Sequence, residues 1–343
     1  MTASKRPLTI GTVTVDPPLI LAPMAGCTSL PLRVLCRRAG AGLVCTEMVS
    51  AMAIAHGNRK TAHLMAIHAS EHPVSVQLFG GEPDIMAAAV PAAEAAGADV
   101  IDINMGCGVP KVRRANAGVT LLGDPDRAVA VARAMVAVAR VPITAKLRAG
   151  MHEGDDSYLE LARRLADVGV SAIGLHGRHA NQAFAGTVSL TAIERLTSTI
   201  SVPILGSGDV FAVADVLRML EAGCGGVMIA RGALGRPWIF SQAAEALRLG
   251  LTAGELRLSG LMPDPPWRER LGIALCHAQM LALYNGEDIA VHEMRGHVRW
   301  YTHRMPGGGA LRGKINHIRT LSELAAIFTD WAAPETEADL SAE

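Results

Sequence analysis

The feature that most constrains the fold is a series of apolar runs that recur roughly every 30 residues, the length of one βα unit. Each run contains a few apolar or β-branched residues and ends in a polar residue and usually a glycine. Strands buried on both faces of a parallel sheet have this composition, and helical patterns separate the runs. The eight runs cover residues 18–26, 41–50, 73–80, 98–106, 141–150, 170–178, 202–210 and 225–232.

Eight successive βα units predict an α/β fold, a TIM (β/α)8 barrel, followed here by a small all-helical C-terminal domain. A doubly wound sheet is the alternative, but no Gly-x-Gly-x-x-Gly sequence follows the first run. In a barrel, the polar residues that close the runs meet at the end where barrel enzymes place their active sites. These residues are Met24, Glu47, Gln77, Asn104, Lys146, His176, Ser207 and Arg231.

Composition changes after the last run. Residues 1–250 are expected to form the barrel, a Pro-rich stretch at 251–267 a linker, residues 268–331 a helical domain, and residues 332–343 an acidic, frayed tail. The formal net charge of zero excludes a globally basic nucleic-acid binder but leaves room for a local basic face.

Cysteine spacing and hydropathy narrow the class of protein further. The six cysteines form no CxxC pair and no zinc-type cluster with histidine, so we expect no metal and a reducing compartment. The chain shows neither a leader-like apolar segment nor a membrane-spanning run. We therefore expect a soluble, cytoplasmic protein without a membrane partner, and a monomer.

The residues at the strand ends suggest a flavin pocket. Residues 22–26, "APMAG", offer backbone groups with little obstruction to a flat ring, and Gln77 can donate and accept at a ring edge. Lys146 places a cation where a reduced flavin becomes negative. A phosphate site is expected after the seventh and eighth strands, where barrels commonly bind one. The expected cofactor contacts are Pro23, Met24, Ala25, Gln77, Lys146, Ser207, Gly208, Asp209, Ala230 and Arg231.

The motifs "LAPMAG", "TEMVS", "VQLFG", "DINMGC", "AKLR", "LHGR", "GSGD" and "GRPWIF" occur in this order. Together they resemble the motif series of tRNA-dihydrouridine synthases, most closely the bacterial B-type, over roughly residues 10–325. The resemblance implies a barrel that binds FMN, a helical RNA-binding domain, and reduction of uridine in tRNA to dihydrouridine with NADPH as the hydride donor. It implies that the hydride passes from FMN N5 to uracil C6.

Four positions depart from the family pattern. Gly108 stands where a proline normally follows the cysteine, and Gly296 stands where a lysine is usual in the helical signature. Ser207 replaces an asparagine and Ala230 a glycine in the phosphate loops. Ser207 and Ala230 are small and should leave the pocket unchanged. Gly108 is expected to affect the rigidity of the cysteine loop, and Gly296 one RNA contact.

Cys107 lies between two glycines directly after the fourth predicted strand. Reduction of uracil requires a proton at C5 as well as a hydride at C6. A free thiol, with a pKa of about 8.5, is mostly protonated at neutral pH and can supply that proton. The family's catalytic cysteine maps onto Cys107, which is therefore the expected acid; the alternative is a small structural residue in a tight loop.

Several polar residues are expected to contact the substrate. Asn104 could bond the uracil edge or the flavin, or it could cap the strand end, and the resemblance has His176 holding flavin and base. Lys111, Arg113 and Arg114 could grip phosphates beside the target base, or form a solvated charge run. In the helical domain, Arg295 and Arg299 share a helix face. The expected substrate contacts are Asn104, Lys111, Arg113, Arg114, Arg178, Arg295 and Arg299.

Residues 291–320 contain six basic residues against the single acid Glu293, which predicts that this segment binds tRNA, with a solvated face as the alternative. Three other functions remain open for the whole chain. They are an FMN- and folate-dependent RNA uracil methyltransferase, a non-catalytic RNA-binding barrel, and a flavin dehydrogenase of small molecules.

Overall fold

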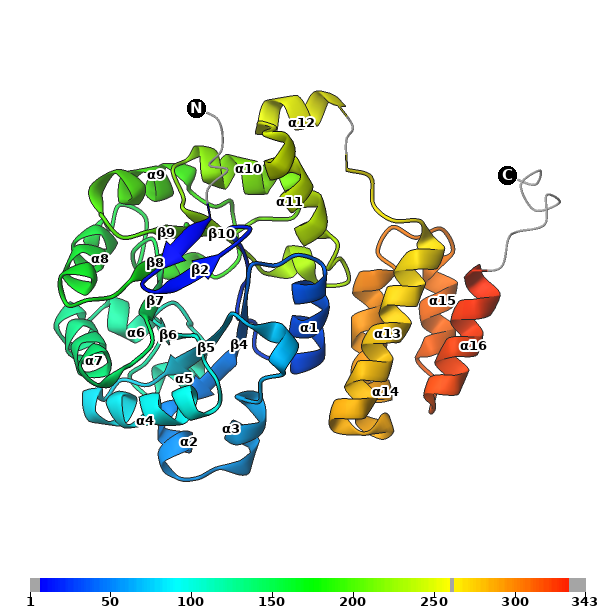
Figure 1. Ribbon diagram of the computed structural model, residues 1–343, viewed down its shortest axis with the longest axis horizontal. Coiled ribbons are helices and arrows are strands. Elements are labelled where there is room, and N and C mark those ends of the chain that lie inside the picture. Colours follow the sequence, from blue (N-terminus) through cyan, green and yellow to red (C-terminus); the bar gives the residue numbers. More distant parts are fainter. Residues whose placement is uncertain (1–6, 260–261, 333–343) are drawn as a thin grey trace. The chain divides into compact units, whose positions relative to one another are not determined.

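The computed structural model describes residues 7–259 and 262–332, and eight parallel strands in it close into a barrel (Figure 1). Around the barrel each strand pairs with the next along the chain, and the last, β10, pairs with the first, β3. One strand lies in each predicted apolar run, so the predicted TIM barrel is confirmed. The strands are β3 (Leu19–Leu21), β4 (Leu43–Ser50), β5 (Val74–Phe79), β6 (Val100–Asn104), β7 (Ile143–Arg148), β8 (Ala172–His176), β9 (Ile204–Ser207) and β10 (Gly226–Ile229).

The strand register brings polar side chains to one level of the barrel. Asn104 at the end of β6 pairs with Lys146 on β7. Arg148 at the end of β7 pairs with His176, which in turn pairs with Ser207 at the end of β9. The apolar residues before them are buried in the core, so the chemistry is confined to the carboxyl ends of the strands.

Helices follow the strands and cover the outside of the barrel. In α8, for example, the buried residues are Tyr158, Leu161, Ala162 and Leu165, which have the spacing of a single helix face. The longer covering helices are α1 (Leu30–Arg38), α4 (Pro83–Ala95), α7 (Pro125–Val138), α8 (Ser157–Asp167), α9 (Leu190–Thr199), α10 (Val213–Glu221) and α11 (Ile239–Leu249). Shorter helices are α2 (Ala51–Ala55), α3 (Arg59–Leu64), α5 (Pro110–Arg113) and α6 (Val119–Leu122).

A hairpin of β1 (Leu8–Ile10) and β2 (Val13–Val15) lies across the barrel and is drawn dark blue in Figure 1. Leu8, Ile10 and Val15 are buried in one cluster with residues from the amino-terminal parts of the strands, such as Leu43 and Val100. The hairpin therefore closes the barrel at the end opposite the polar residues. Sequence analysis did not predict it, because each of its strands is only three residues long.

The chain divides into two compact units. The barrel unit comprises Met1–Ala233 and Trp238–Met262, and the helical unit comprises Leu234–Pro237 and Pro263–Glu343. The helical unit contains the predicted helices, as α13 (Trp267–Asn285), α14 (Glu287–Tyr301), α15 (Gly308–Ile315) and α16 (Leu321–Ala332). The acidic tail predicted at 332–343 falls, beyond residue 332, outside the described residues.

The predicted linker at 251–267 contains a helix, α12 (Ala253–Ser259), that belongs to the barrel unit. Its first turn is fixed because Glu255 Oε2 accepts the Thr252 N–H at 2.8 Å. Glu221 Oε1 of α10 accepts the Ala253 N–H at the same distance. The helix is thus tied to the barrel, and the prolines that suggested a linker follow it.

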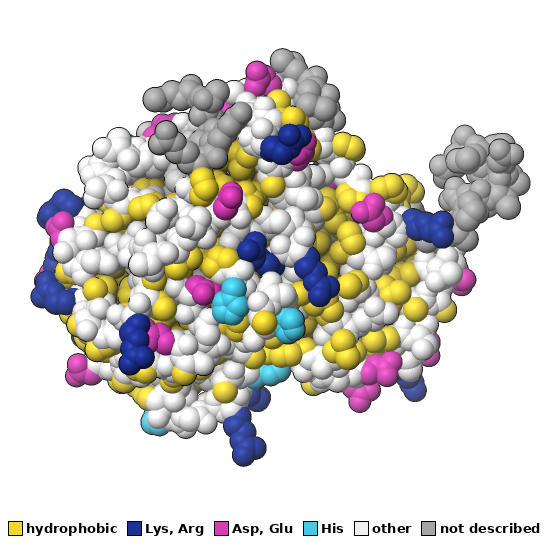
Figure 2. Space-filling model, in the orientation of Figure 1, with side chains coloured by type: hydrophobic (Ala, Val, Ile, Leu, Met, Phe, Trp, Pro, Cys, Tyr) yellow, Lys and Arg dark blue, Asp and Glu magenta, His cyan; other side chains and the backbone are white. Residues whose placement is uncertain are grey.

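None of the described helices is long and apolar enough to cross a membrane. Within residues 7–259 and 262–332, no three His, Cys, Asp or Glu side chains are grouped so that they could hold a metal ion. On the face of the barrel unit that carries the hairpin, Lys and Arg side chains are scattered rather than gathered, and several lie beside acidic ones (Figure 2).

Candidate active site at the carboxyl ends of the barrel strands

Two amide side chains form the floor of the site. Gln77 on β5 is 1% exposed, and its Nε2 donates to Asp102 Oδ2 at 2.7 Å. Its Oε1 accepts from Asn104 Nδ2 at 2.8 Å. Asn104 Oδ1 in turn accepts the Cys107 N–H at 3.0 Å and the Gly106 N–H at 3.3 Å. Both amides predicted to contact cofactor or substrate are therefore also bonded to the protein, and they link β5 and β6 to the cysteine loop.

Cys107 is a half-buried free thiol on the loop after β6. Its carbonyl oxygen accepts the Val119 N–H at 2.9 Å. Gly118 has a φ of +62°, and a Cβ there would lie 2.3 Å from that oxygen, so only glycine fits. Gly108 is different, since a Cβ on it would have nothing closer than Val119 Cγ1 at 4.0 Å. A larger side chain at position 108 would therefore extend into open space, so the glycine found here costs no packing contact.

Four cationic side chains surround His176. Burial, together with the charges of Lys146, Arg148, Arg178 and Arg231, lowers the pKa of His176 to about 2. The imidazole is therefore neutral at physiological pH. Arg178 Nη1 lies 3.5 Å from His176 Nε2, and its shorter bond, of 2.8 Å, is to Asp209 Oδ1. This part of the site attracts anions without a charged histidine.

Arg178 is held by the phosphate-loop acid Asp209. Its Nη1 and Nη2 donate to the two carboxylate oxygens at 2.8 and 2.7 Å, and its side chain is 3% exposed. Arg178 was predicted as a substrate contact, but in the structure its buried guanidinium also donates to the main-chain oxygens of residues 185 and 186. Gly208 has a φ of +111°, and a Cβ there would lie 2.6 Å from His176 Cδ2. Ser207 is buried at the end of β9.

Arg231 keeps more freedom than Arg178. Its Nη2 lies 3.4 Å from Asp209 Oδ1, and its side chain is 44% exposed. Its guanidinium carbon lies 4.9 Å from the ring centre of Phe184 and 5.1 Å from that of Phe211. Ala230, the residue before it, packs against the barrel core. Arg231 is thus the arginine best placed to accept an additional anionic partner.

The loop after β3 contains the remaining predicted cofactor contacts. They are Pro23, Met24 and Ala25. Thr28 Oγ1 bonds both the N–H and the carbonyl oxygen of Met24, each at 3.1 Å, and Glu47 Oε2 accepts the Gly26 N–H at 2.5 Å. These bonds fix a short turn whose Ala25 and Gly26 remain exposed.

The predicted RNA contacts fall into two groups. Lys111 and Arg113, on α5, and Arg114 just after it are exposed, while Val112 between them is buried. In the helical unit, Arg295 Nη2 donates to the carbonyl oxygen of Ile318 at 2.6 Å, which uses this arginine inside the unit.

Arg299 is exposed and lines an open groove of about 380 Å³, which we call the arginine groove. The residues that line it are Arg299, His303, Arg304, Arg312 and Asn316. No acidic side chain is among them. Gly296 faces open space, since a Cβ on this residue would have no neighbouring atom within 4 Å.

The family assignment rests on comparison with known proteins. The chain matches the family model described as dihydrouridine synthase (Dus) over residues 20–336. It belongs to this family. It is 36% identical to the "Probable tRNA-dihydrouridine synthase 1" of Synechocystis sp. over 93% of this chain and 87% of that one. It is 35% identical to the "tRNA-dihydrouridine synthase B" of Xanthomonas campestris, over 94% and 95% of the two chains. The predicted membership of the B-type group is confirmed.

The barrel of this dihydrouridine synthase family member is also similar to that of a solved old yellow enzyme homologue from Zymomonas mobilis. The TM-score is 0.50 and the identity 13%, over 67% of this chain and 89% of the other. At this identity the similarity concerns the fold alone.

Sequence analysis of this dihydrouridine synthase overlooked three residues of the site. Asp102 lies in an apolar run that gave no sign of its partners Gln77 and Thr144. Arg148 is buried, and its Nε donates to the Gly106 carbonyl oxygen at 2.9 Å while Nη1 donates to Ala183 O at 2.9 Å. Phe184 is 61% exposed over Arg231. The position of Arg148 two residues after Lys146, on the same strand face, is the signal that could have found it.

Proposed function

We propose that this protein reduces uridines in tRNA to 5,6-dihydrouridine, with FMN as the bound cofactor and NADPH as the hydride donor. The observation that carries the proposal is the half-buried Cys107 thiol, whose main-chain N–H is bonded to Asn104 and whose loop is bonded to Arg148, one of the cations around His176, in a chain of the dihydrouridine synthase family. We further propose that it acts as a cytoplasmic monomer.

The residues present fit FMN. The pocket holds four cations around a neutral histidine, which suits a phosphate and a ring that becomes anionic on reduction. Gly208 leaves room where a Cβ would clash, and Arg231 is exposed enough to bond a phosphate. The turn at residues 23–25 would support the ring, and Lys146 would lie near its polar edge. When bound, FMN supplies the hydride, from N5 to uracil C6.

Cys107 supplies the proton in this proposal. Its Sγ–H donates to the carbanion-like C5 of uracil, on the opposite side of the base from the hydride. General-acid help of this kind contributes about 10² to 10⁴ in rate. The bond from the Cys107 N–H to Asn104 fixes the main chain that carries the thiol, and neutral His176 can hold the base by hydrogen bonds without competing as an acid.

Binding of tRNA is assigned to the arginine groove. Its three arginines lie close together without a carboxylate among the lining residues, which suits the phosphate backbone. Thr302 orients one of them, because Arg312 Nη1 donates to Thr302 Oγ1 at 3.2 Å. Lys111, Arg113 and Arg114 beside the cysteine loop would contact phosphates next to the target base, which must be turned out of its stack at a cost of a few kcal/mol.

Two measurements test the proposal. Purified protein is denatured and the released flavin is chromatographed, with FMN expected; FAD, or no flavin after reconstitution, would contradict it. The protein is then incubated with NADPH and tRNA from a strain lacking the gene, with and without methylenetetrahydrofolate, and nucleosides are analysed by mass spectrometry. Uridine gaining two hydrogens is expected, whereas a gain of a methyl group would identify a methyltransferase and no change would reject the activity.

A further inference from the structure

A line of hydrogen bonds runs from the barrel interior to the main chain of Cys107. Thr144 Oγ1 donates to Asp102 Oδ1 at 2.6 Å, and Gln77 Nε2 donates to Asp102 Oδ2 at 2.7 Å. Asn104 Nδ2 donates to Gln77 Oε1 at 2.8 Å, and Asn104 Oδ1 accepts the Cys107 N–H at 3.0 Å. Every member of this line from Asp102 to Asn104 is buried.

The direction of these bonds is the same from either end, since the main-chain N–H groups of the cysteine loop only donate and a carboxylate only accepts. A glutamine or asparagine side chain can present either its oxygen or its nitrogen to a neighbour, whereas a carboxylate only accepts. Asp102 Oδ2 therefore requires Nε2 of Gln77, which turns Oε1 toward Asn104. Asn104 must then present Nδ2 to Gln77, which turns its Oδ1 toward the amides of the cysteine loop. A proton on Asp102 Oδ1, shared with Thr144, would leave this direction unchanged.

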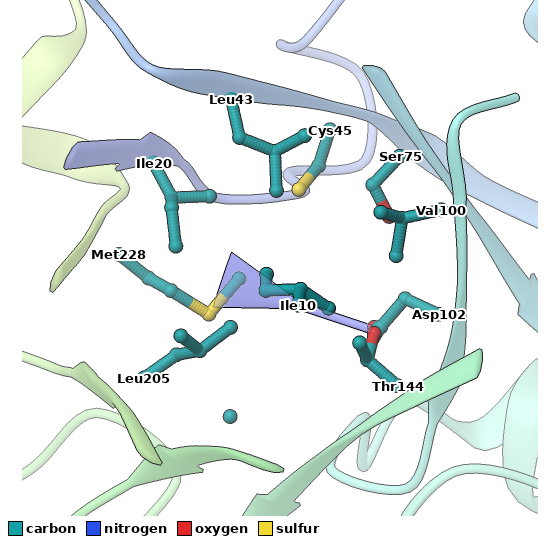
Figure 3. A pocket seen from close by; sticks show the side chains of 11 residues that line it. Ile10, Ile20, Leu43, Cys45, Ser75, Val100, Asp102, Thr144, Leu205 and Met228 are labelled. Carbon is teal, nitrogen blue, oxygen red and sulfur yellow. The ribbon is translucent and has the colours of Figure 1, made fainter. Parts of the chain in front are cut away.

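Apart from these bonds and the buried ammonium group of Lys146, whose charged form its carboxylate favours, the surroundings of Asp102 give no reason for a carboxyl group there. It lies beside a cavity of about 10 Å³ inside the barrel, and Figure 3 shows its carboxyl group next to Thr144 at the cavity's edge. The rest of the lining is largely apolar, with Ile10, Ile20 and Met228 pointing inward. Burial of a carboxylate costs desolvation free energy, so for core stability alone an apolar residue of similar shape would be at least as favourable.

We propose that Asp102 is a positioning residue for uridine reduction: as the acceptor at the buried end of this line, it holds the Gln77 and Asn104 amides in place and thereby holds the Cys107 loop in its proton-donating conformation. This inference rests on the proposed function, in which Cys107 is the acid. Asp102 touches neither substrate nor cofactor in this proposal. It affects the reaction only by holding the loop that carries Cys107.

Three variants separate this role from packing. Asp102→Leu keeps the branched shape of the side chain but leaves Gln77 without its acceptor. Asp102→Asn keeps the line, because the N–H groups of the cysteine loop fix its direction from the other end; its Oδ1 then accepts from Gln77 while its Nδ2 donates to a Thr144 hydroxyl turned to accept. Thr144→Val is the matched control, since it removes the bond on the other carboxyl oxygen and spares the line to Cys107.

Amide hydrogen exchange of the protein without RNA, read by mass spectrometry over residues 105–108, is the first measurement. Asp102→Leu is expected to speed exchange there about tenfold or more while the other barrel strands stay protected; Asp102→Asn and Thr144→Val should resemble the unaltered protein. The second measurement is turnover of tRNA, where Asp102→Leu should lower kcat about tenfold or more with a nearly unchanged KM for tRNA.

Unchanged exchange at 105–108 in Asp102→Leu would overturn the inference. Equal effects in all three variants, or faster exchange throughout the barrel, would also overturn it by showing a packing role. The exchange measurement needs neither substrate nor cofactor turnover, so its outcome is independent of whether the proposed reaction is correct.

Discussion

The thiol of Cys107 has a matched comparison in Cys276, which is also a half-buried free cysteine but lies in the helical unit. Cys107→Ala should leave reduction of the bound flavin by NADPH nearly unchanged but lower tRNA reduction by at least about tenfold, the lower range for a lost general acid. Stopped-flow absorbance of the flavin and dihydrouridine analysis measure the two steps. Cys276→Ala should change neither step. Loss of flavin from Cys107→Ala would instead indicate a structural residue.

Lys146 introduces a pH dependence. Burial lowers its pKa to about 8, with the carboxylate of Asp102 opposing this shift and the guanidinium of Arg148 adding to it. The ammonium group is therefore charged below about pH 8 and loses its charge as pH rises through that value. Because a positive charge favours the reduced, anionic flavin, the midpoint potential should drop additionally above about pH 8.

Lys146→Met should lower that potential at all pH values and remove the extra drop near pH 8. Spectroscopic redox titration at several pH values measures this, and Lys111→Met, an exposed lysine on α5, is the control. A Lys146→Met profile parallel to that of the unaltered protein would exclude Lys146 as the group responsible.

At the residue scale, sequence reasoning found which side chains meet but not how each is used. Periodicity and strand-end position identified Gln77, Asn104 and His176, because every barrel strand ends at the same mouth. It could not show that Arg178 is buried against Asp209, since that pairing depends on a loop conformation with a positive φ at residue 209. Asp102 was missed because a polar residue inside an apolar run is recognised only by its partners across strands.

At the scale of elements, α1 is joined to the segment before β5 by a buried ion pair. Arg33 Nε lies 2.6 Å from Glu71 Oε2, and these side chains are 2% and 0% exposed. Arg33 Nη1 also donates to the Thr28 carbonyl oxygen at 3.0 Å, which connects the pair to the turn proposed to support FMN.

Glu71→Gln should lower the free energy of unfolding by about 3 kcal/mol, because removing one partner leaves the other charge buried. Urea denaturation followed by circular dichroism measures this. Arg163→Ala, which breaks exposed ion pairs with Glu160 and Asp167 on α8, should cost less than about 1 kcal/mol. Equal losses of unfolding free energy in the two variants would show that the buried ion pair contributes no more to stability than the exposed ones.

The long covering helices and the buried strands were predictable because their periodicity extends over many residues. The short elements were not. The β1–β2 hairpin has too few residues for a pattern, and α12 was hidden by the prolines that follow it.

At the scale of the whole molecule, a chain of zero net charge can still bind tRNA through a local field. Arg299→Ala combined with Arg304→Ala should weaken tRNA binding. It should also reduce the slope of log affinity against log salt by about 0.7 to 0.9 for each phosphate that the protein no longer binds. Filter binding at several salt concentrations measures both effects. Flavin reduction by NADPH should be unaffected.

Arg195→Ala, an exposed arginine of the barrel unit paired with Asp156, is the control and should leave the slope unchanged. Arg295→Ala should affect stability more than the slope, because its guanidinium bonds Ile318 O. If the affinity of the double variant is unchanged at every salt concentration, the arginine groove does not bind RNA, and the contact lies instead at Lys111, Arg113 and Arg114.

The β1–β2 hairpin has a consequence for how the chain folds. Ile10 and Val15 pack with Leu205 and Met228, and Val227 pairs with Leu19, so the hairpin and β3 find these partners only after the last barrel strands have been synthesised. Contacts so distant in sequence form slowly, because the intervening loop must be closed before they contribute. Until β10 is in place, the apolar side chains of the hairpin have no complete core to enter. The nascent chain therefore exposes an apolar segment while most of the barrel is being synthesised. Exposed apolar segments of this kind aggregate easily and are bound by chaperones.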